Sequence, residues 1–310
     1  MKVIFMGTPE FSVGTLQAII EAGHEVVLCV TQPDKPKGRG KEMTYTPVKE
    51  EALKHGIPIF QPFKIREEKS ISELEKYEAD VCVVVAFGQI IPKEVLEMTR
   101  YGCINVHASL LPKYRGAAPI QWAIIDGESA TGVTTMQMDE GLDTGDMLLK
   151  TVVPISSTET SGTLHDKLSD AGAKLLIKTL EDIKNGNVKP EKQGETTTEY
   201  AAMIHKSMGN INWNDDATKI ERLIRAMSPW PSAYTNWHER VIKIWEANVI
   251  EKNTDALQGT VIRVDKNSFS VQTGEGTLEI KSVQLPGKKR VDADAFLRGH
   301  KLVTGTVLGK

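Results

Sequence analysis

The chain has 310 residues, of which 40% are hydrophobic and 25% are charged, and its formal net charge is −3. This composition is ordinary for a soluble globular protein and leaves room for two domains. No apolar run approaches the ~18 residues that a membrane helix needs, and the one at the N-terminus is too short for a signal peptide. We therefore expect a cytoplasmic protein.

Charge is distributed unevenly along the chain. From Lys206 onward there are 16 basic and 12 acidic residues, about +4, which leaves about −7 for the rest. This asymmetry favours two different roles for the two parts, although chance drift between domains would also produce it. The three cysteines, Cys29, Cys82 and Cys103, lack metal-type spacing and are expected to be free thiols in a reducing compartment.

The chain opens with a strand–helix–strand unit typical of a Rossmann-like, mostly parallel α/β sheet. An apolar strand over Val3–Met6 precedes a helix over Phe11–Ala22 and a second strand over Glu25–Thr31. Only one glycine, Gly7, follows the first strand, so the dinucleotide-binding fingerprint is missing. This disfavours an NAD-dependent dehydrogenase.

A long basic loop over residues 32–47 follows the second strand. Lys37, Arg39 and Lys41 lie in it among glycines and prolines. Loops of this length inside compact domains are usually functional or disordered. The segment is either a solvated linker or a contact for a polyanion.

The sheet is expected to continue with a strand over Ile57–Pro62 and a strand over Ala79–Ala86. The second is a continuous apolar run, which is typical of a central parallel strand. Phe87, Gly88 and Gln89 then turn into the next helix.

The most informative stretch is residues 101–125. Cys103–His107 is expected to be a buried strand, and alternation along it places Asn105 and His107 on one face. The turn Ser109-Leu110-Leu111-Pro112 and a glycine-containing loop follow, and Pro119 suits the first turn of a helix. Open α/β sheets hold their ligands at such places. Two polar side chains here favour a site, although a satisfied core histidine is the alternative.

Further along, a strand over residues 131–138 leads into an acidic loop that contains Asp143. Four acidic residues in eight do not match the calcium-loop spacing, so no metal is expected there. A strand over residues 148–153 and a long helix over residues 160–185 complete the sheet domain. We expect this domain to span residues 1–188 and the polar segment over residues 189–206 to be a linker.

The C-terminal part, residues 207–310, is expected to be a small β-domain. A helix over residues 217–226 and the bend Ser228-Pro229-Trp230-Pro231 precede short β-rich runs. Strands over residues 241–250, 259–264, 268–273, 278–285 and 301–303 suit an OB-like barrel. Lys288, Lys289 and Arg290 form a basic turn, which is either simply solvated or an RNA contact.

Asn105-x-His107 with Ser109-Leu110-Leu111-Pro112 resembles the folate-dependent formyltransferase superfamily. The longer motif through Tyr114-Arg115-Gly116-Ala117-Ala118-Pro119 is similar to that of the methionyl-tRNA formyltransferases, and the resemblance extends over essentially the whole chain. It implies transfer of a formyl group from 10-formyltetrahydrofolate to the α-amino group of methionine on initiator tRNA, without a metal. Membrane association is not expected, and the enzyme is expected to be a monomer.

The resemblance also implies roles for individual residues. It makes Asn105, His107 and Asp143 the catalytic set. The expected folate-binding residues are Ser109, Leu110, Leu111, Pro112, Phe87, Gly88 and Gln89. The expected tRNA-binding residues are Arg39, Lys37, Lys41, Lys206, Lys288, Lys289 and Arg290. In this assignment Asn105 and His107 polarise the formyl carbonyl, while Asp143 orients His107 and handles the proton of the amine.

Two other functions stay open on the sequence. A formyltransferase acting on a small amine, such as a nucleotide-linked sugar, or a formyl-folate hydrolase would use the same catalytic set without a basic C-terminal domain. A non-catalytic RNA-binding module would leave that set idle and would not bind folate.

Overall fold

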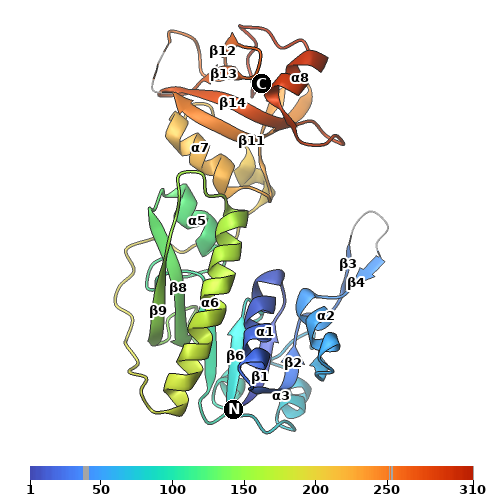
Figure 1. Ribbon diagram of the computed structural model, residues 1–310, viewed down its shortest axis with the longest axis vertical. Helices are drawn as coiled ribbons and strands as arrows, with labels where there is room; N and C mark the ends of the chain where they lie inside the picture. The colour runs from blue at the N-terminus through green and yellow to red at the C-terminus, as the bar shows by residue number, and fades with distance from the viewer. Residues whose placement is uncertain (38–41, 251, 253, 310) are drawn as a thin grey trace. The chain divides into compact units, whose positions relative to one another are not determined.

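The computed structural model describes residues 1–37, 42–250, 252 and 254–309. The chain forms two compact units, each described here by itself (Figure 1). The first unit comprises Met1–Pro119, Ala130–Pro154 and His165–Ala201. The second comprises Ile120–Ser129, Ile155–Leu164 and Ala202–Lys310, so it takes two short pieces from the N-terminal half. Among the described residues, no helix has both the length and the apolar character that a bilayer crossing requires.

The first unit is built on a seven-stranded sheet with the order β5-β2-β1-β6-β7-β8-β9. Its strands are β1 (Lys2–Gly7), β2 (Glu25–Val30), β5 (Ile59–Phe60), β6 (Val81–Val85), β7 (Cys103–His107), β8 (Ala130–Gln137) and β9 (Met147–Pro154). The first five strands in this order are parallel, and β8 and β9 run antiparallel to their neighbours. The expected mostly parallel, Rossmann-like sheet is confirmed.

Helices cover both faces of this sheet. They are α1 (Val13–Glu21) after a short 3-10 turn η1 (Glu10–Ser12), α2 (Pro47–Lys54), α3 (Glu68–Leu74), α4 (Lys93–Leu96) and α6 (Ser161–Lys184). The helix α5 (Pro119–Ile125) belongs, apart from Pro119, to the second unit. Leu74 of α3 and Val95 of α4 belong to one buried cluster with Ile4 and Cys103. On the opposite face, α6 packs so closely on β7 that a Cβ at Gly172 would lie 2.9 Å from Val106 Cγ1. One face of β7 therefore packs toward the cluster that includes α3 and α4, and the other face packs on α6.

The segment over residues 32–47 is not the irregular loop that we expected. It contains an antiparallel hairpin of β3 (Lys35–Lys37) and β4 (Glu42–Thr44), in which Lys35 pairs with Thr44. Each strand has three residues and one includes a proline, so the segment carries no periodic β-pattern. At the base of the hairpin, Asp34 pairs with Lys49 of α2.

The second unit contains a six-stranded antiparallel sheet with the order β10-β11-β14-β13-β12, and β15 pairs with β14. Its strands are β10 (Ala233–Trp237), β11 (Arg240–Ile250), β12 (Val261–Val264), β13 (Phe269–Gln272), β14 (Thr277–Gln284) and β15 (Val291–Asp292). The helical elements are η2 (Lys206–Gly209), α7 (Ala217–Ala226) and α8 (Ala293–Gly299). Within the described part of the chain no pairing joins β10 to β12, so the structure shows an antiparallel sheet rather than a closed barrel.

Four details of the C-terminal part differ from the sequence-based prediction. Residues 301–303 form no strand, while β10, β15 and α8 were not expected. Leu302 is nevertheless buried, and so is Phe296 of α8. Short apolar runs therefore could not distinguish a strand from a helix or a buried loop here.

Candidate active site

Asn105 and His107 lie on β7, on the face opposite Val106. The neighbouring strands hold this backbone: Asn105 pairs with Val84 of β6 and Met136 of β8. The Asn105 and His107 residues are only 8% and 6% exposed. Among the described residues, none hydrogen-bonds the side-chain amide of Asn105, whose donor and acceptor therefore stay available to a ligand.

The imidazole of His107 has one nitrogen committed to the backbone. His107 Nε2 lies 3.0 Å from the carbonyl oxygen of Tyr114. Because a carbonyl oxygen can only accept, Nε2 carries a proton and donates it. The nitrogen that is left for chemistry is therefore Nδ1, which faces Asp143 Oδ1 at 3.7 Å.

The loop after β7 is shaped by its own hydrogen bonds. The Thr134 hydroxyl accepts from the Leu111 amide at 3.1 Å and donates to the Ser109 carbonyl at 2.7 Å. Ser109 Oγ donates to the Lys113 carbonyl at 2.6 Å. The Leu111–Pro112 peptide is cis, and Tyr114 has a positive φ of 56°. Together these features turn the chain so that the Tyr114 carbonyl meets His107.

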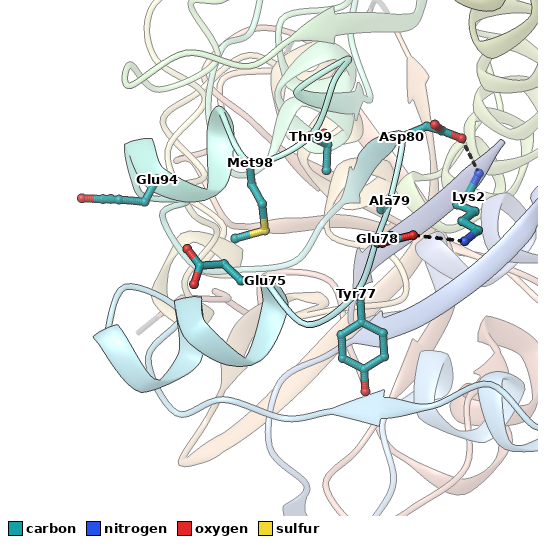
Figure 2. Close-up of a pocket in the computed structure, with 9 residues that line it drawn as sticks. All are labelled: Lys2, Glu75, Tyr77, Glu78, Ala79, Asp80, Glu94, Met98 and Thr99. Atoms are coloured by element: carbon teal, nitrogen blue, oxygen red, sulfur yellow. Dashed lines mark hydrogen bonds and ion pairs between the residues drawn. The ribbon is translucent and has the colours of Figure 1, made fainter.

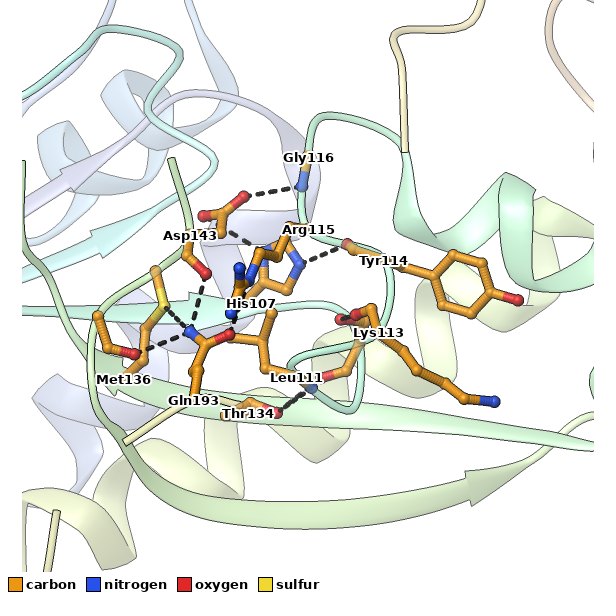
Figure 3. A network of polar contacts seen from close by, with 12 residues as sticks. His107, Leu111, Lys113, Tyr114, Arg115, Gly116, Thr134, Met136, Asp143 and Gln193 are labelled. Atoms are coloured by element: carbon orange, nitrogen blue, oxygen red, sulfur yellow. Dashed lines mark hydrogen bonds and ion pairs between the residues drawn. The ribbon is translucent and has the colours of Figure 1, made fainter. Parts of the chain in front are cut away.

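Asp143 reaches the histidine from the turn between β8 and β9. Its Oδ2 accepts a hydrogen bond of 2.9 Å from the amide of Gly116, which leaves Oδ1 directed at His107 (Figure 3). Asp143 itself has a φ of 56°, in the left-handed region that few residues other than glycine adopt. Within the same turn, Asp139 Oδ1 accepts from the Gly141 amide and the Thr144 hydroxyl. The structure thus brings Asn105, His107 and Asp143 to one end of β7 and its adjoining turns.

The segment that we predicted to be a linker contributes to this site. Gln193 Nε2 donates to the carbonyls of Asp143 and Gly145, both at 2.8 Å. Its Oε1 accepts from Arg115 Nε at 2.8 Å (Figure 3). Sequence analysis missed Gln193 because it lies in a polar stretch without periodicity, and no local pattern distinguishes it from other surface glutamines.

The residues predicted to bind folate fall into two groups. In the first, Phe87 is 2% exposed and packs in the core, and the Gln89 amide bridges Ile65 N and the Pro62 carbonyl. Gly88 is exposed between them. In the second group Ser109 and Leu111 are buried, and Leu110 and Pro112 are half-buried. Direct folate contacts by either group stay a prediction.

The residues predicted to bind tRNA are only partly described. Arg39 and Lys41 lie outside the described residues, and of Lys37 only the backbone, in β3, is described. Lys206 is exposed at the start of η2, and Lys288 and Lys289 are exposed in the turn after β14. Arg290 donates to Ser282 Oγ at 2.8 Å and pairs with Glu246 at 3.2 Å.

The buried cysteine thiols are unsuited to nucleophilic chemistry. Burial raises the pKa of the Cys29 thiol to about 12. A hydrogen bond with Cys82, together with burial, raises the pKa of the Cys103 thiol well above its usual value. Both thiols therefore stay protonated and unreactive near neutral pH.

A sizeable cavity of the first unit lies away from these residues. It has a volume of about 660 Å³ and is lined by Lys2, Asp80 and neighbouring residues at the beginning of β1 and β6 (Figure 2). The catalytic candidates lie instead where β7 ends. No group of three or more histidine, cysteine or acidic side chains within the described ranges could hold a metal ion.

Comparison with known proteins identifies the family. The sequence pattern described as "Formyl transferase" matches residues 1–180, and "Formyl transferase, C-terminal domain" matches residues 203–301. The chain belongs to the formyl transferase family. It is 58% identical over 306 residues to a protein of Agathobacter rectalis named methionyl-tRNA formyltransferase, covering 99% of both chains. A Lachnospira eligens protein of the same name is 54% identical and covers all of both chains.

Solved structures of the formyl transferase family share the fold at low sequence identity. One is the N-formyltransferase from Helicobacter canadensis in complex with folinic acid and dTDP-3-aminofucose. It is 18% identical, aligns with a TM-score of 0.65, and covers 90% of this chain and 98% of its own. At this identity the likeness supports the fold alone.

Proposed function

We propose that this formyl transferase moves the formyl group of 10-formyltetrahydrofolate to the α-amino group of methionine on initiator tRNA, to give formylmethionyl-tRNA for translation initiation. The observation that carries the proposal is the identity of 54–58% with proteins named methionyl-tRNA formyltransferase, over essentially the full length of both chains. The basic character of the C-terminal part supports a nucleic-acid substrate.

The chemistry needs a polarised formyl carbonyl and a route for one proton. The α-amine, with a pKa of roughly 8, is nucleophilic once neutral, and its attack on the formyl carbon creates a tetrahedral oxyanion. We assign the Asn105 side-chain N–H as a donor to that oxyanion, because no described residue uses it. The folate nitrogen takes a proton as it leaves.

His107 and Asp143 act as a pair in this scheme. Because His107 Nε2 donates to the Tyr114 carbonyl, the ring can donate to the oxyanion only from a protonated Nδ1. The carboxylate of Asp143 faces that nitrogen at 3.7 Å. The Asp143 carboxylate also accepts the proton that the attacking amine loses, directly or through water.

The rest of the chain supplies binding. We assign the two loops with Phe87–Gln89 and Ser109–Pro112 to the folate, largely through backbone groups. The basic segment with Lys37, Arg39 and Lys41 and the basic residues of the C-terminal unit are assigned to the tRNA. We divide the chain into a catalytic domain over residues 1–188, a linker over 189–206 and an OB-like tRNA-binding domain over 207–310, with a monomer as the working assembly.

One assay tests the function. Radiolabelled formyl-folate is incubated with initiator methionyl-tRNA, with elongator methionyl-tRNA or with a nucleotide-linked amino sugar, each at two salt concentrations. We expect label on initiator methionyl-tRNA, falling at higher salt. Label on the sugar, or release of free formate without transfer, would instead support the small-amine transferase or the hydrolase.

The same assay tests the catalytic pair. We expect Asp143→Ala to fold and to lose transfer by at least about a hundredfold, because the ring loses the carboxylate that faces it and the amine loses its proton acceptor. Wild-type turnover by Asp143→Ala would overturn the role.

A further inference from the structure

Residues 191–201, which we call the strap, are fastened at both ends by backbone hydrogen bonds. At the first end, Glu191 and Met147 exchange two hydrogen bonds of 2.8 Å. At the second end, the amide of Ala201 donates to Arg115 at 2.8 Å and its carbonyl accepts from Ala118 at 3.1 Å. Met147 follows the turn that carries Asp143, and Arg115 precedes Gly116. The strap therefore spans the two loops that meet at Asp143.

Most of the strap between its ends is exposed, and only Gln193 and Thr198 are half-buried. These same two residues direct side chains inward. Thr198 Oγ1 accepts from the Tyr114 amide at 2.8 Å, next to the carbonyl that holds His107. Gln193 makes three short hydrogen bonds, to Asp143, Gly145 and Arg115, and its Nε2 also lies 4.0 Å from Met136 Sδ. The side chains that point inward thus contact the residues that position His107 and Asp143.

The three hydrogen bonds fix the orientation of the Gln193 amide. Both of its N–H groups point at carbonyl oxygens, and its oxygen faces the N–H of Arg115. In a flipped amide, the side-chain oxygen would face two carbonyl oxygens, and acceptors cannot hydrogen-bond one another. Gln193 consequently joins the turn of Asp143 to the loop of Arg115 and Gly116 in one orientation only.

This connection matters because the backbone of Asp143 is strained. Its φ of 56° is unfavourable for a residue with a Cβ, so surrounding contacts must maintain it. One such contact is the carboxylate bond to the Gly116 amide, and another is the Gln193 bond to the Asp143 carbonyl. Without Gln193, the Asp143 carbonyl would lose this donor, and the bond of the carboxylate to the Gly116 amide would remain.

We propose that Gln193 is a positioning residue for formyl transfer, which holds Asp143 at the distance and angle that it needs toward His107. The proposal rests on the proposed function, since it assumes that Asp143 takes part in the reaction. Gln193 acts through Asp143 and does not itself touch the reacting atoms.

Two substitutions separate the hydrogen bonds from the shape of the side chain. Gln193→Met keeps a similar length and volume and removes all three bonds. Gln193→Glu keeps the pairing with Arg115 but sets a carboxylate oxygen against the carbonyls of Asp143 and Gly145. Lys192→Ala is the matched control, because the neighbouring Lys192 side chain is 90% exposed and its nearest acid, Asp146, is 3.9 Å away.

We expect Gln193→Met to lower kcat by about ten- to a hundredfold, since a misplacement near 1 Å can cost about a hundredfold. The KM values for formyl-folate and tRNA should stay within about threefold, and Tm should fall by no more than about 4 °C. Gln193→Glu should lower kcat at least as much as Gln193→Met, and the kcat of Lys192→Ala should resemble that of wild type. If the Tm of Gln193→Met falls by more than about 4 °C, Gln193→Glu takes its place in the double mutant with Asp143→Ala.

A double-mutant comparison distinguishes positioning from general destabilisation. In an Asp143→Ala background, Gln193→Met should lower kcat no further, because the group that it positions is gone. Equal losses in both backgrounds, or a wild-type kcat for Gln193→Met alone, would overturn the proposal. If Asp143→Ala itself turns over like wild type, the assigned chemistry fails instead, so the two failures are distinguishable.

Discussion

Replacing Asn105 by alanine separates catalysis from stability. The backbone of Asn105 is held by pairing with β6 and β8, and its side chain makes no hydrogen bond to another described residue. Alanine preserves the backbone bonds and removes only the amide. The folded protein therefore loses no internal hydrogen bond, whereas the reaction loses the donor that we assign to the oxyanion.

The two effects differ greatly in size. Removing one donor to an oxyanion typically costs about 10²–10³ in rate, or about 3–4 kcal/mol of transition-state stabilisation. Removing a side chain that satisfies no buried group should change the free energy of unfolding by less than about 1 kcal/mol, or about 2–4 °C in Tm for a chain of this size. For comparison, His107→Ala would remove an internal hydrogen bond, the one from His107 Nε2 to the Tyr114 carbonyl.

The assay is the single-turnover rate of formyl transfer with both substrates saturating, measured beside a thermal unfolding curve. Asn105→Asp tests the same donor with almost no change in volume, and Asn185→Ala, an exposed asparagine just after α6, is the matched control. We expect the transfer rate of Asn105→Ala and of Asn105→Asp to fall at least about a hundredfold, and that of the control to stay unchanged. A rate within threefold of wild type for Asn105→Ala, at unchanged Tm, would refute the assignment of its amide to the oxyanion.

Two further predictions concern Arg39 and Glu51. Arg39→Ala should raise the KM for tRNA and leave the KM for formyl-folate unchanged, in steady-state kinetics at low salt; equal effects on both substrates would contradict the loop assignment. Hydrogen bonds from Lys54 and Gln17 hold the pKa of the buried Glu51 carboxyl at about 2, against its usual 4.5. A lowered pKa stabilises the fold above pH 4.5 by about 3 kcal/mol, and that stabilisation is lost as the pH falls toward 2. The Tm deficit of Glu51→Gln, measured by calorimetry, should therefore shrink across this range, and a deficit independent of pH would contradict the assignment.

The strand that carries Asn105 and His107 was predictable from local sequence. Apolar residues alternate with these two polar ones over β7, and a proline- and glycine-containing turn follows directly. Periodicity of this kind is a property of neighbouring residues, so the two faces of β7 could be assigned before the fold was known. The other strands of this sheet were predicted from local apolar runs as well, but their order in the sheet was not.

The contribution of Gln193 could not be predicted in this way. Its partners, Asp143, Gly145 and Arg115, lie far from it along the chain, and a glutamine in a polar stretch is usually solvated. The sequence did not predict the pairing of β3 with β4, or α8, for a related reason. Both are too short for a period to establish itself, so their conformation depends on what packs against them.

The site therefore combines two modes of positioning that differ in their origin. Asn105 and His107 inherit their direction from β7, whose backbone is bonded on both sides and whose opposite face packs on α6. Asp143 comes from a turn, in a strained conformation, and its place depends on individual polar contacts with Gly116 and Gln193. Because the proposed reaction uses all three groups at one carbonyl, its geometry is only as well defined as the least constrained of them. The relative positions of the three side chains consequently depend most on Asp143 and on the polar groups that hold it.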